Sequence, residues 1–327
     1  MKIADMHCDT ISKLWECKRE NNPQQLSHNN LHVDIQRMKK AGYILQNFAM
    51  YIDLEKDFDP FEYVLELIDI FYEEMEKNKS DIGVIKCFDD FLYNEQQGRL
   101  SALMTIEEGG CCKGEIENLE KLYALGARMM TLTWNYPNEL ASPNILTEKK
   151  DNKGFYLFDS TRGLTNKGYA FIERMEELGI IIDVSHLSDA GFWDIANHTK
   201  KPFVASHSNA RELCGHARNL TDEMIRTIAD RGGVIGLNFY GCFLNEAANS
   251  YSSVERMAKH ARHIINIGGS ECLGLGSDFD GIDGKLEMED CSQMYKLVEE
   301  LEKQQFTMTQ IEKIFYQNTL RVYQEIF

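Results

Sequence analysis

Residues 179–186 read GIIIDVSH, and residues 232–240 read GGVIGLNFY. Both runs begin at glycine and are almost entirely apolar. A strand that is buried on both of its faces has this composition, because neither face meets water. An amphipathic, helix-like segment follows each run. The two segments therefore predict buried parallel strands that alternate with helices.

The same strand-and-helix unit recurs along the whole chain. Eight candidate strands can be read: Lys2–Asp9, Tyr43–Asp53, Leu100–Glu107, Ala127–Trp134, Gly179–His186, Pro202–Ser208, Gly233–Tyr240 and Leu273–Asp278. Eight rounds of alternation predict a closed (β/α)8 barrel, the TIM barrel of metal-dependent hydrolases, with a doubly wound open sheet as the alternative. No Pro/Gly/Ser-rich linker divides the chain, so we expect one domain over residues 1–327.

One connection is much longer than the others. Residues 135–165 follow the fourth predicted strand and are rich in Asn, Pro, Lys and Gly. A loop of this length in a compact domain is usually functional or disordered. We interpret it as a rim over the active site, with a simple insertion as the alternative.

The composition narrows the class of protein. A net charge of −17 over 327 residues repels nucleic acids and anionic lipid surfaces. Neither a signal-peptide run in residues 1–30 nor an apolar stretch of membrane-spanning length appears in the sequence. The nine cysteines form no CxxC pair, and we interpret Cys111 and Cys112 as bystanders rather than metal ligands. These features predict a cytoplasmic protein without nucleic-acid or membrane partners.

Side chains that can bind metals or transfer protons stand at the carboxyl ends of five predicted strands. In a (β/α)8 barrel these ends meet in the active site. On the first strand, residues i and i+2 share a face, so His7 and Asp9 can point into the barrel mouth together. The other four strands end in Glu107-Glu108-Gly109-Gly110, at His186, at His207, and at Asp278 within GSDFDG.

Three imidazoles and three carboxylates suit zinc, while manganese, cobalt and iron accept the same ligands. The set is too large for one tetrahedral ion. Two ions that share a bridging carboxylate would use it fully, and one remaining carboxylate could transfer protons. The residues thus predict a binuclear metal centre.

The order of the motifs resembles the membrane dipeptidase (renal dipeptidase) family of binuclear zinc peptidases, in a bacterial-type cytoplasmic form. The resemblance covers the whole chain: DMHCDT corresponds to the family's D-G-H-N-D element and EEGG to its E-G-G. DVSHLS, ASHSNAR, ARN and GSDFDG follow in the same order. The resemblance implies a dipeptidase that cleaves its substrate through a metal-bridging hydroxide and tolerates a C-terminal D-amino acid.

The resemblance also implies a role for each residue. His7 and Asp9 look like the ligands of the first zinc, and His186 and His207 like those of the second. Glu108 looks like the carboxylate that bridges both ions together with a water or hydroxide, and that contributes to catalysis. Asp278 resembles the proton-handling aspartate. Arg218 corresponds to the arginine that binds the terminal carboxylate of the substrate, a task that suits a guanidinium fork.

One position departs from the family pattern. Animal members carry a histidine after the Leu-Thr of the fourth strand, and Trp134 stands there in this chain. An indole donates one hydrogen bond but is neither an acid nor a base. We therefore expect Trp134 and Asn135 to contact the substrate, with a changed substrate range.

Two other function classes stay open. One is a different binuclear hydrolase on the same barrel, acting on lactones, cyclic amides or phosphotriesters. The other is a non-catalytic barrel that only binds a ligand. For the dipeptidase, the expected partner is a small-molecule dipeptide, and a homodimer is possible.

Overall fold

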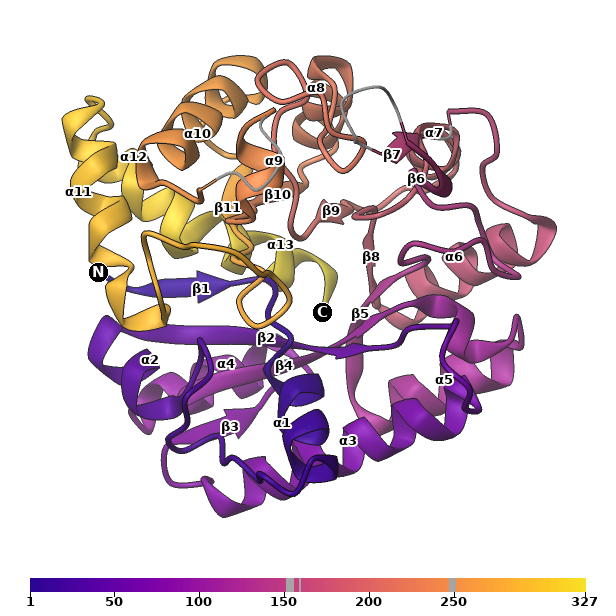
Figure 1. The fold of residues 1–327 in the computed structure, drawn as a ribbon, viewed down its shortest axis with the longest axis horizontal. Helices are drawn as coiled ribbons and strands as arrows, with labels where there is room; N and C mark the ends of the chain where they lie inside the picture. The colour runs from indigo at the N-terminus through magenta and orange to yellow at the C-terminus, as the bar shows by residue number, and fades with distance from the viewer. Residues whose placement is uncertain (151–155, 159, 247–250) are drawn as a thin grey trace.

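The computed structural model describes residues 1–150, 156–158, 160–246 and 251–327. Its centre is a ring of eight parallel strands (Figure 1). The ring consists of β1 (Ile3–Asp5), β2 (Tyr43–Tyr51), β4 (Leu100–Glu107), β5 (Ala127–Thr131), β8 (Ile181–Asp183), β9 (Val204–Ala205), β10 (Val234–Leu237) and β11 (Leu273–Leu275). Each strand lies within a segment that the sequence predicts. The predicted (β/α)8 barrel is confirmed.

Closure of the ring depends on the pairing of β2 with β4. The two strands pair in parallel from Leu45 opposite Ser101 to Tyr51 opposite Glu107. The short strand β3 (Ile82–Val84) lies between them in sequence but pairs only with the beginning of β4, outside the ring. The sequence analysis did not predict β3. Because β2 pairs with β4 directly, their carboxyl ends stand side by side at the barrel mouth.

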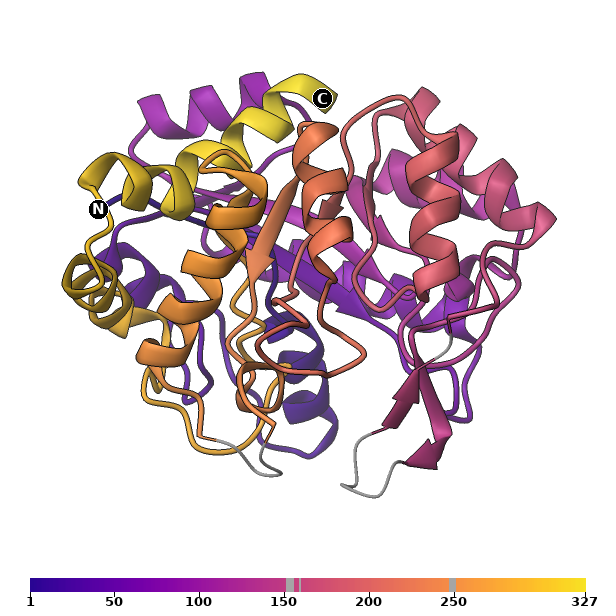
Figure 2. The same ribbon diagram turned by 90° about the horizontal axis from the view of Figure 1, so that it is seen from above.

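Helices surround the ring (Figures 1 and 2). The longest, α3 (Pro60–Lys77), begins where Asp59 accepts hydrogen bonds from the backbone N–H groups of Phe61 and Glu62, which is a side-chain N-cap followed by proline. The other helices are α1 (Thr10–Arg19), α2 (Ile35–Ala41), α4 (Phe88–Gln96), α5 (Ile116–Leu125), α6 (Asn166–Leu178), α7 (Asp189–His198), α8 (Asp222–Asp230), α9 (Gly241–Leu244), α10 (Val254–Gly268), α11 (Tyr295–Lys303), α12 (Met308–Glu312) and α13 (Asn318–Ile326). Short helical turns cover Gly109–Cys112, Cys291–Gln293 and Lys313–Gln317.

One end of the barrel interior is filled by apolar side chains and by α13. Figure 2 shows α13 at the opposite end of the barrel from the β6–β7 hairpin. The interior cluster contains Ala4, Leu45, Leu103, Met129, Ile181, Val204 and Val234 from the strands, Met6 directly after β1, and Val322, Tyr323 and Ile326 from α13. The open end is therefore the one at which the strands terminate, and it carries the polar side chains.

Part of the long connection 135–165 forms an antiparallel hairpin of β6 (Ile145–Lys150) and β7 (Tyr156–Phe158). Residues 151–155 and 159 of the predicted rim lie outside the described residues. Ile145, at the start of β6, lines the large cavity at the barrel mouth.

Within the described residues, no helix is both long enough and apolar enough to span a lipid bilayer.

Candidate metal centre and active site

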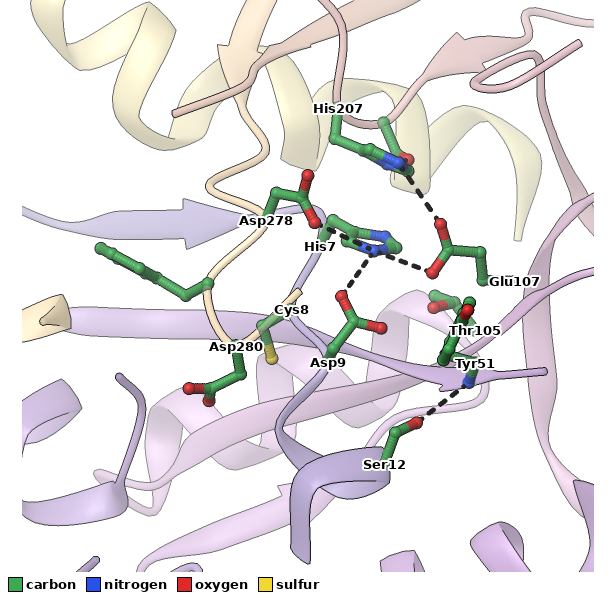
Figure 3. Close-up of polar contacts among 12 residues, drawn as sticks. His7, Cys8, Asp9, Ser12, Tyr51, Thr105, Glu107, His207, Asp278 and Asp280 are labelled. Carbon is green, nitrogen blue, oxygen red and sulfur yellow. Dashed lines mark hydrogen bonds and ion pairs between the residues drawn. The ribbon is translucent and has the colours of Figure 1, made fainter. Parts of the chain in front are cut away.

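Six side chains from five strand ends converge at the barrel mouth. His7 and Asp9 follow β1, Glu107 ends β4, His186 follows β8, His207 follows β9 and Asp278 follows β11. The sequence predicted five of these six residues. The sixth, Glu107, takes the place predicted for Glu108. Figure 3 shows His7 at the middle of the group, facing Asp9, Glu107 and Asp278.

Short distances join the members of this cluster. The Nε2 atom of His7 lies 3.3 Å from Asp9 Oδ2, 3.3 Å from Glu107 Oε2 and 3.9 Å from Asp278 Oδ1. The second oxygen of Glu107, Oε1, lies 3.1 Å from His186 Nε2 and 3.5 Å from His207 Nε2. Glu107 therefore faces His7 with one oxygen and the other two imidazoles with the other.

The prediction that Glu108 belongs to the cluster is wrong. Glu107 lies there instead. Side chains alternate along a strand, so Glu107 shares the inward face of β4 with Leu103 of the interior cluster. Glu108 follows the strand with φ of 112° and points elsewhere. Its carboxylate accepts hydrogen bonds from Gly110 N (2.6 Å), Trp134 N (2.8 Å) and Asn138 Nδ2 (2.5 Å). Glu108 thus holds the loop that follows β5.

The outer nitrogens of two imidazoles have partners that fix their orientation. His186 Nδ1 lies 3.0 Å from Asn135 Oδ1, which can only accept, so Nδ1 carries the hydrogen. His207 Nδ1 lies 2.7 Å from Ser206 Oγ. The two Nε2 atoms point into the cluster and lie 3.1 Å apart. Partners of this kind orient metal-binding histidines in proteins.

Burial and neighbouring charges shift the acid–base behaviour of the cluster. Burial lowers the pKa of His186 to about 3, assisted by the positive charge of Arg218. Burial, together with the negative charge of Glu107, raises the pKa of Asp9 to about 7 and that of Asp278 to about 6. Burial would also raise the pKa of Glu107, but the surrounding imidazoles, His7 foremost, hold it well below the usual range. Buried ionisable groups whose pKa values are shifted in this way are typical of functional sites.

The donor set fits divalent metal ions. Two groups offer ligand atoms within 4.8 Å of one another: His7, Glu107 and His207, and His7, Asp9 and Asp278. Both ring nitrogens of the buried His7 lack a hydrogen-bonding partner among the described residues. A buried polar atom without a partner is costly, and a cation would satisfy it. Imidazole nitrogens and carboxylate oxygens are both among the ligands that zinc binds in proteins.

The turn after β11 brings Asp278 close to Asp9. Asp278 and Asp280 both have left-handed backbones, with φ of 62° and 68°. A Cβ atom on Gly281 would lie 2.2 Å from Asp9 Oδ2 and 2.6 Å from Asp278 Oδ1. Only glycine leaves room for both carboxylates, so this position of the GSDFDG motif contributes directly to the shape of the site.

A cavity of about 620 Å³ opens onto the cluster. Its walls include Asp9, Glu107, His186 and Asp278, together with Tyr51, Trp134, Asn135, Ile145, His216, Tyr240 and Phe243. The Trp134 ring contacts Tyr51 edge-on, with ring centroids 5.0 Å apart. Trp134 and Asn135 therefore line the cavity, and Asn135 also contacts His186.

Arg218 is buried behind the metal cluster rather than in the cavity wall. Its Nη2 donates to the backbone oxygen of His207 (3.2 Å), and its Nη1 donates to Ser208 Oγ (3.4 Å). Among the described residues no carboxylate lies within ion-pairing distance of this guanidinium. Burial lowers the pKa of Arg218 to about 10, opposed by the charge of Asp278, so the group is positively charged at neutral pH.

Comparison with known protein families decides the identity of this barrel. Residues 1–326 match the model of the membrane dipeptidase family, peptidase family M19. The chain belongs to this family. It is accordingly a dipeptidase-family metallopeptidase with a metal cofactor, as the resemblance of its motifs implied.

Two curated relatives of this family member support the assignment. An uncharacterized dipeptidase of Schizosaccharomyces pombe is 32% identical over 309 residues, which covers 90% of this chain and 72% of the relative. An uncharacterized protein encoded in the pqqA 5′ region of Klebsiella pneumoniae is 36% identical over 231 residues, covering 70% of this chain and 83% of the relative.

Solved structures share the fold over the full length of the chain. A metallopeptidase of Rhodobacter sphaeroides, solved with a phosphinate mimic of the dipeptide L-Ala-D-Ala, superposes with a TM-score of 0.89 at 22% identity, covering 100% of this chain and 99% of that one. A second metallopeptidase, dipeptidase AC of family M19, gives a TM-score of 0.89 at 23% identity, covering 100% and 98%.

Sequence reasoning missed two features of the site. Strand alternation from Leu103 could have identified Glu107, because residues 103, 105 and 107 share one face of β4. Asp183 and Ser206, which lie beneath His207, were not singled out. Their pairing requires knowledge of the strand register.

Proposed function

We propose that this member of the M19 family hydrolyses the peptide bond of dipeptides and uses two zinc ions. The observation that carries the proposal is the cluster of imidazoles and carboxylates from five strand ends, with the buried His7 facing three carboxylates at its centre. We propose that His7 and Asp9 hold one ion and that His186 and His207 hold the other. Glu107, with one oxygen toward each pair, takes the bridging role that the sequence analysis gave to Glu108.

When bound, two zinc ions would activate one water as the nucleophile and polarise the carbonyl of the substrate. Asp278 is the proposed proton-handling residue. Its Oδ2 accepts a hydrogen bond from Asn238 Nδ2 (2.9 Å), which fixes the carboxylate at the cavity wall. A carboxylate held beside the reacting groups can take a proton and return it. Protonation of the departing amine is the step that needs such a group.

Arg218 is the proposed partner of the substrate's terminal carboxylate. A buried guanidinium without an ionic partner is unfavourable, and a carboxylate offers it two parallel hydrogen bonds. Arg218 adjoins the cavity at Phe243, whose ring centroid lies 5.3 Å from the guanidinium carbon, so the terminal carboxylate of a bound substrate would have to lie at that end of the cavity. This requirement favours short substrates with a free carboxyl end.

Tolerance of a C-terminal D-amino acid is part of the proposal. The Rhodobacter sphaeroides relative was solved with an L-Ala-D-Ala mimic. Trp134 and Asn135 are the proposed contacts for the rest of the dipeptide, because both line the cavity. The cytoplasmic location and the homodimer remain predictions from the sequence.

The proposal can be tested with purified protein, measured zinc content and a panel of L-L and L-D dipeptides. Each dipeptide should be paired with its C-terminal amide, which lacks the carboxylate. We expect chelator-sensitive release of amino acids from the free dipeptides and much weaker release from the amides. Zinc-loaded protein that cleaves no dipeptide would contradict the proposal.

A variant of Arg218 separates the dipeptidase from a hydrolase of neutral lactones or cyclic amides. Arg218→Ala should raise KM for free dipeptides and abolish the preference for them over the amides. Arg226→Ala, at an exposed position of α8, is the matched control and should change neither. If Arg218→Ala left dipeptide cleavage intact, a neutral substrate would become the better proposal.

A further inference from the structure

Two buried aspartate–serine pairs lie beneath the metal cluster and share the same strand register. Asp183 on β8 stands opposite Val204 of β9, and it contacts Ser206 two residues further on. Asp5 on β1 stands opposite Leu275 of β11, and it contacts Ser277 two residues further on. In each pair the serine immediately precedes a residue of the cluster, His207 or Asp278.

The first pair surrounds one carboxylate with four hydrogen-bond donors. Asp183 Oδ1 accepts from the backbone N–H groups of Ser185 and Ser206, both at 2.9 Å. Asp183 Oδ2 accepts from Thr131 Oγ1 (3.0 Å) and from Ser206 Oγ in a short contact. All of these residues are buried. The carboxylate is therefore satisfied without a cation.

In the second pair an aspartate again accepts hydrogen bonds from a serine, but that serine has a different second partner. Asp5 Oδ1 accepts from Ser277 N (2.9 Å), and Asp5 Oδ2 accepts from Ser277 Oγ (2.6 Å). The hydroxyl oxygen of Ser277 then accepts from Phe279 N (3.2 Å). Outside the pair, Ser277 Oγ thus contacts only backbone atoms, Phe279 N and His7 O (3.2 Å), whereas Ser206 Oγ lies 2.7 Å from the imidazole Nδ1 of His207.

We propose that Asp183 and Ser206 are positioning residues that hold His207 in the tautomer with its hydrogen on Nδ1. The inference rests on the proposed function, in which His207 Nε2 binds a metal ion. A carboxylate can only accept, so it takes the single hydroxyl hydrogen of Ser206. Ser206 Oγ must then accept from His207, and Nδ1 carries the hydrogen. The lone pair of Nε2 is left facing the cluster.

The direction of this chain of hydrogen bonds depends on the charge of Asp183. An asparagine at position 183 would keep its oxygen on the two backbone N–H groups and turn its amide N–H toward Ser206. Ser206 would then donate to His207, and the hydrogen of the imidazole would move to Nε2. A ring with hydrogen on Nε2 cannot bind a metal through that atom. One substitution of nearly equal size should therefore reverse the tautomer.

The test uses nitrogen NMR of the metal-free, full-length protein, together with zinc affinity from competition with a chelator. In the wild type we expect His207 to show a protonated Nδ1 and a bare Nε2. Asp183→Asn should invert this pattern and weaken zinc binding by about 10- to 100-fold, the usual effect of losing a partner behind a metal ligand. Ser206→Ala should weaken zinc binding in the same range, because Nδ1–H loses its acceptor.

Asp5→Asn and Ser277→Ala are the matched controls, because they disturb an equally buried pair in the same register. Both should leave the His207 nitrogen signals unchanged. In the Ser206→Ala background, Asp183→Asn should have no further effect on the tautomer, because the hydroxyl that links Asp183 to His207 is already absent.

Three outcomes would overturn the inference: a wild-type His207 with hydrogen on Nε2, an unchanged tautomer in Asp183→Asn, or an equal change in Asp5→Asn. None of these would affect the proposed dipeptidase activity. Conversely, a wild-type protein with the expected tautomer but without dipeptide cleavage would contradict the proposed function and leave the positioning role intact. The two ideas can therefore fail separately.

Discussion

The Nε2 atoms of His186 and His207 lie 3.1 Å apart while the opposite ring nitrogens contact Asn135 and Ser206. Two bare nitrogens that face each other repel, and a cation beside them offsets this repulsion. We therefore expect zinc to stabilise the folded protein, by about 2.7 kcal/mol when free zinc is 100 times the dissociation constant. Thermal unfolding with zinc and with chelator measures this difference.

His207→Ala should reduce the zinc content and remove most of the zinc-dependent rise in Tm. His198→Ala is the control, because His198 lies at the end of α7 with a side chain that is 41% exposed. An undiminished zinc content in His207→Ala would remove His207 from the ligand set.

Glu107 and Glu108 should respond in opposite ways to the same substitution. Glu107→Gln removes the charge that faces three imidazoles, so zinc content and activity should fall with little change in unfolding free energy. Glu108→Gln brings an amide N–H against neighbours that all donate, at a cost of about 1–3 kcal/mol in stability. Zinc analysis and urea unfolding of both variants distinguish the two roles. The reverse pattern would restore Glu108 as the ligand.

Asp278→Asn should keep the zinc while lowering kcat by roughly 10²–10⁴-fold, the usual effect of losing an acid–base group. The amide can still interact with Asn238, so the fold should be preserved. Asp89→Asn, at an exposed position of α4, serves as the control. Normal turnover by a zinc-loaded Asp278→Asn enzyme would exclude the proton-handling role.

The buried His260 should make stability depend on pH in the acid range. Burial lowers its pKa to about 4, assisted by the charges of His263 and Arg256. The unfolded chain binds this proton from about pH 6.5 downward. The stability that neutral His260 provides is therefore complete above pH 6.5 and is lost as the pH falls toward 4, by up to about 3 kcal/mol.

The variant His260→Gln should flatten this loss, and urea unfolding at pH 7 and pH 4.5 measures it. His198→Gln, at the exposed site on α7, should retain the full wild-type dependence. Equal slopes for wild type and His260→Gln would assign the acid sensitivity to other groups.

Local sequence patterns were sufficient to predict the barrel and most of the site. Runs such as GIIIDVSH indicate strands that are buried on both faces. Polar residues at the carboxyl ends of such strands meet at the barrel mouth. The E-G-G pattern predicts Glu108 as the ligand, whereas the alternation of side chains along β4 places Glu107 on the inward face. A motif describes which residues occur, whereas the pleat of β4 decides which carboxylate points inward.

Features that depend on contacts between distant strands could not be predicted. The strand β3 is only Ile82–Val84 and pairs at the outer edge of β4, so it leaves no alternating pattern. The contact of Asp183 with Ser206 follows from the register between β8 and β9. No periodicity in a single strand reveals that register.

The helix α13 follows all eight barrel strands in the sequence, and it supplies Val322, Tyr323 and Ile326 to the barrel interior. During synthesis the strands therefore leave the ribosome before the helix that covers their apolar end. Until α13 emerges, a nascent barrel would present Leu45, Leu103 and Met129 to water, where chaperones can bind them. The interior is thus completed only after α13 has been synthesised, and translation that stops before α13 should yield chains that aggregate.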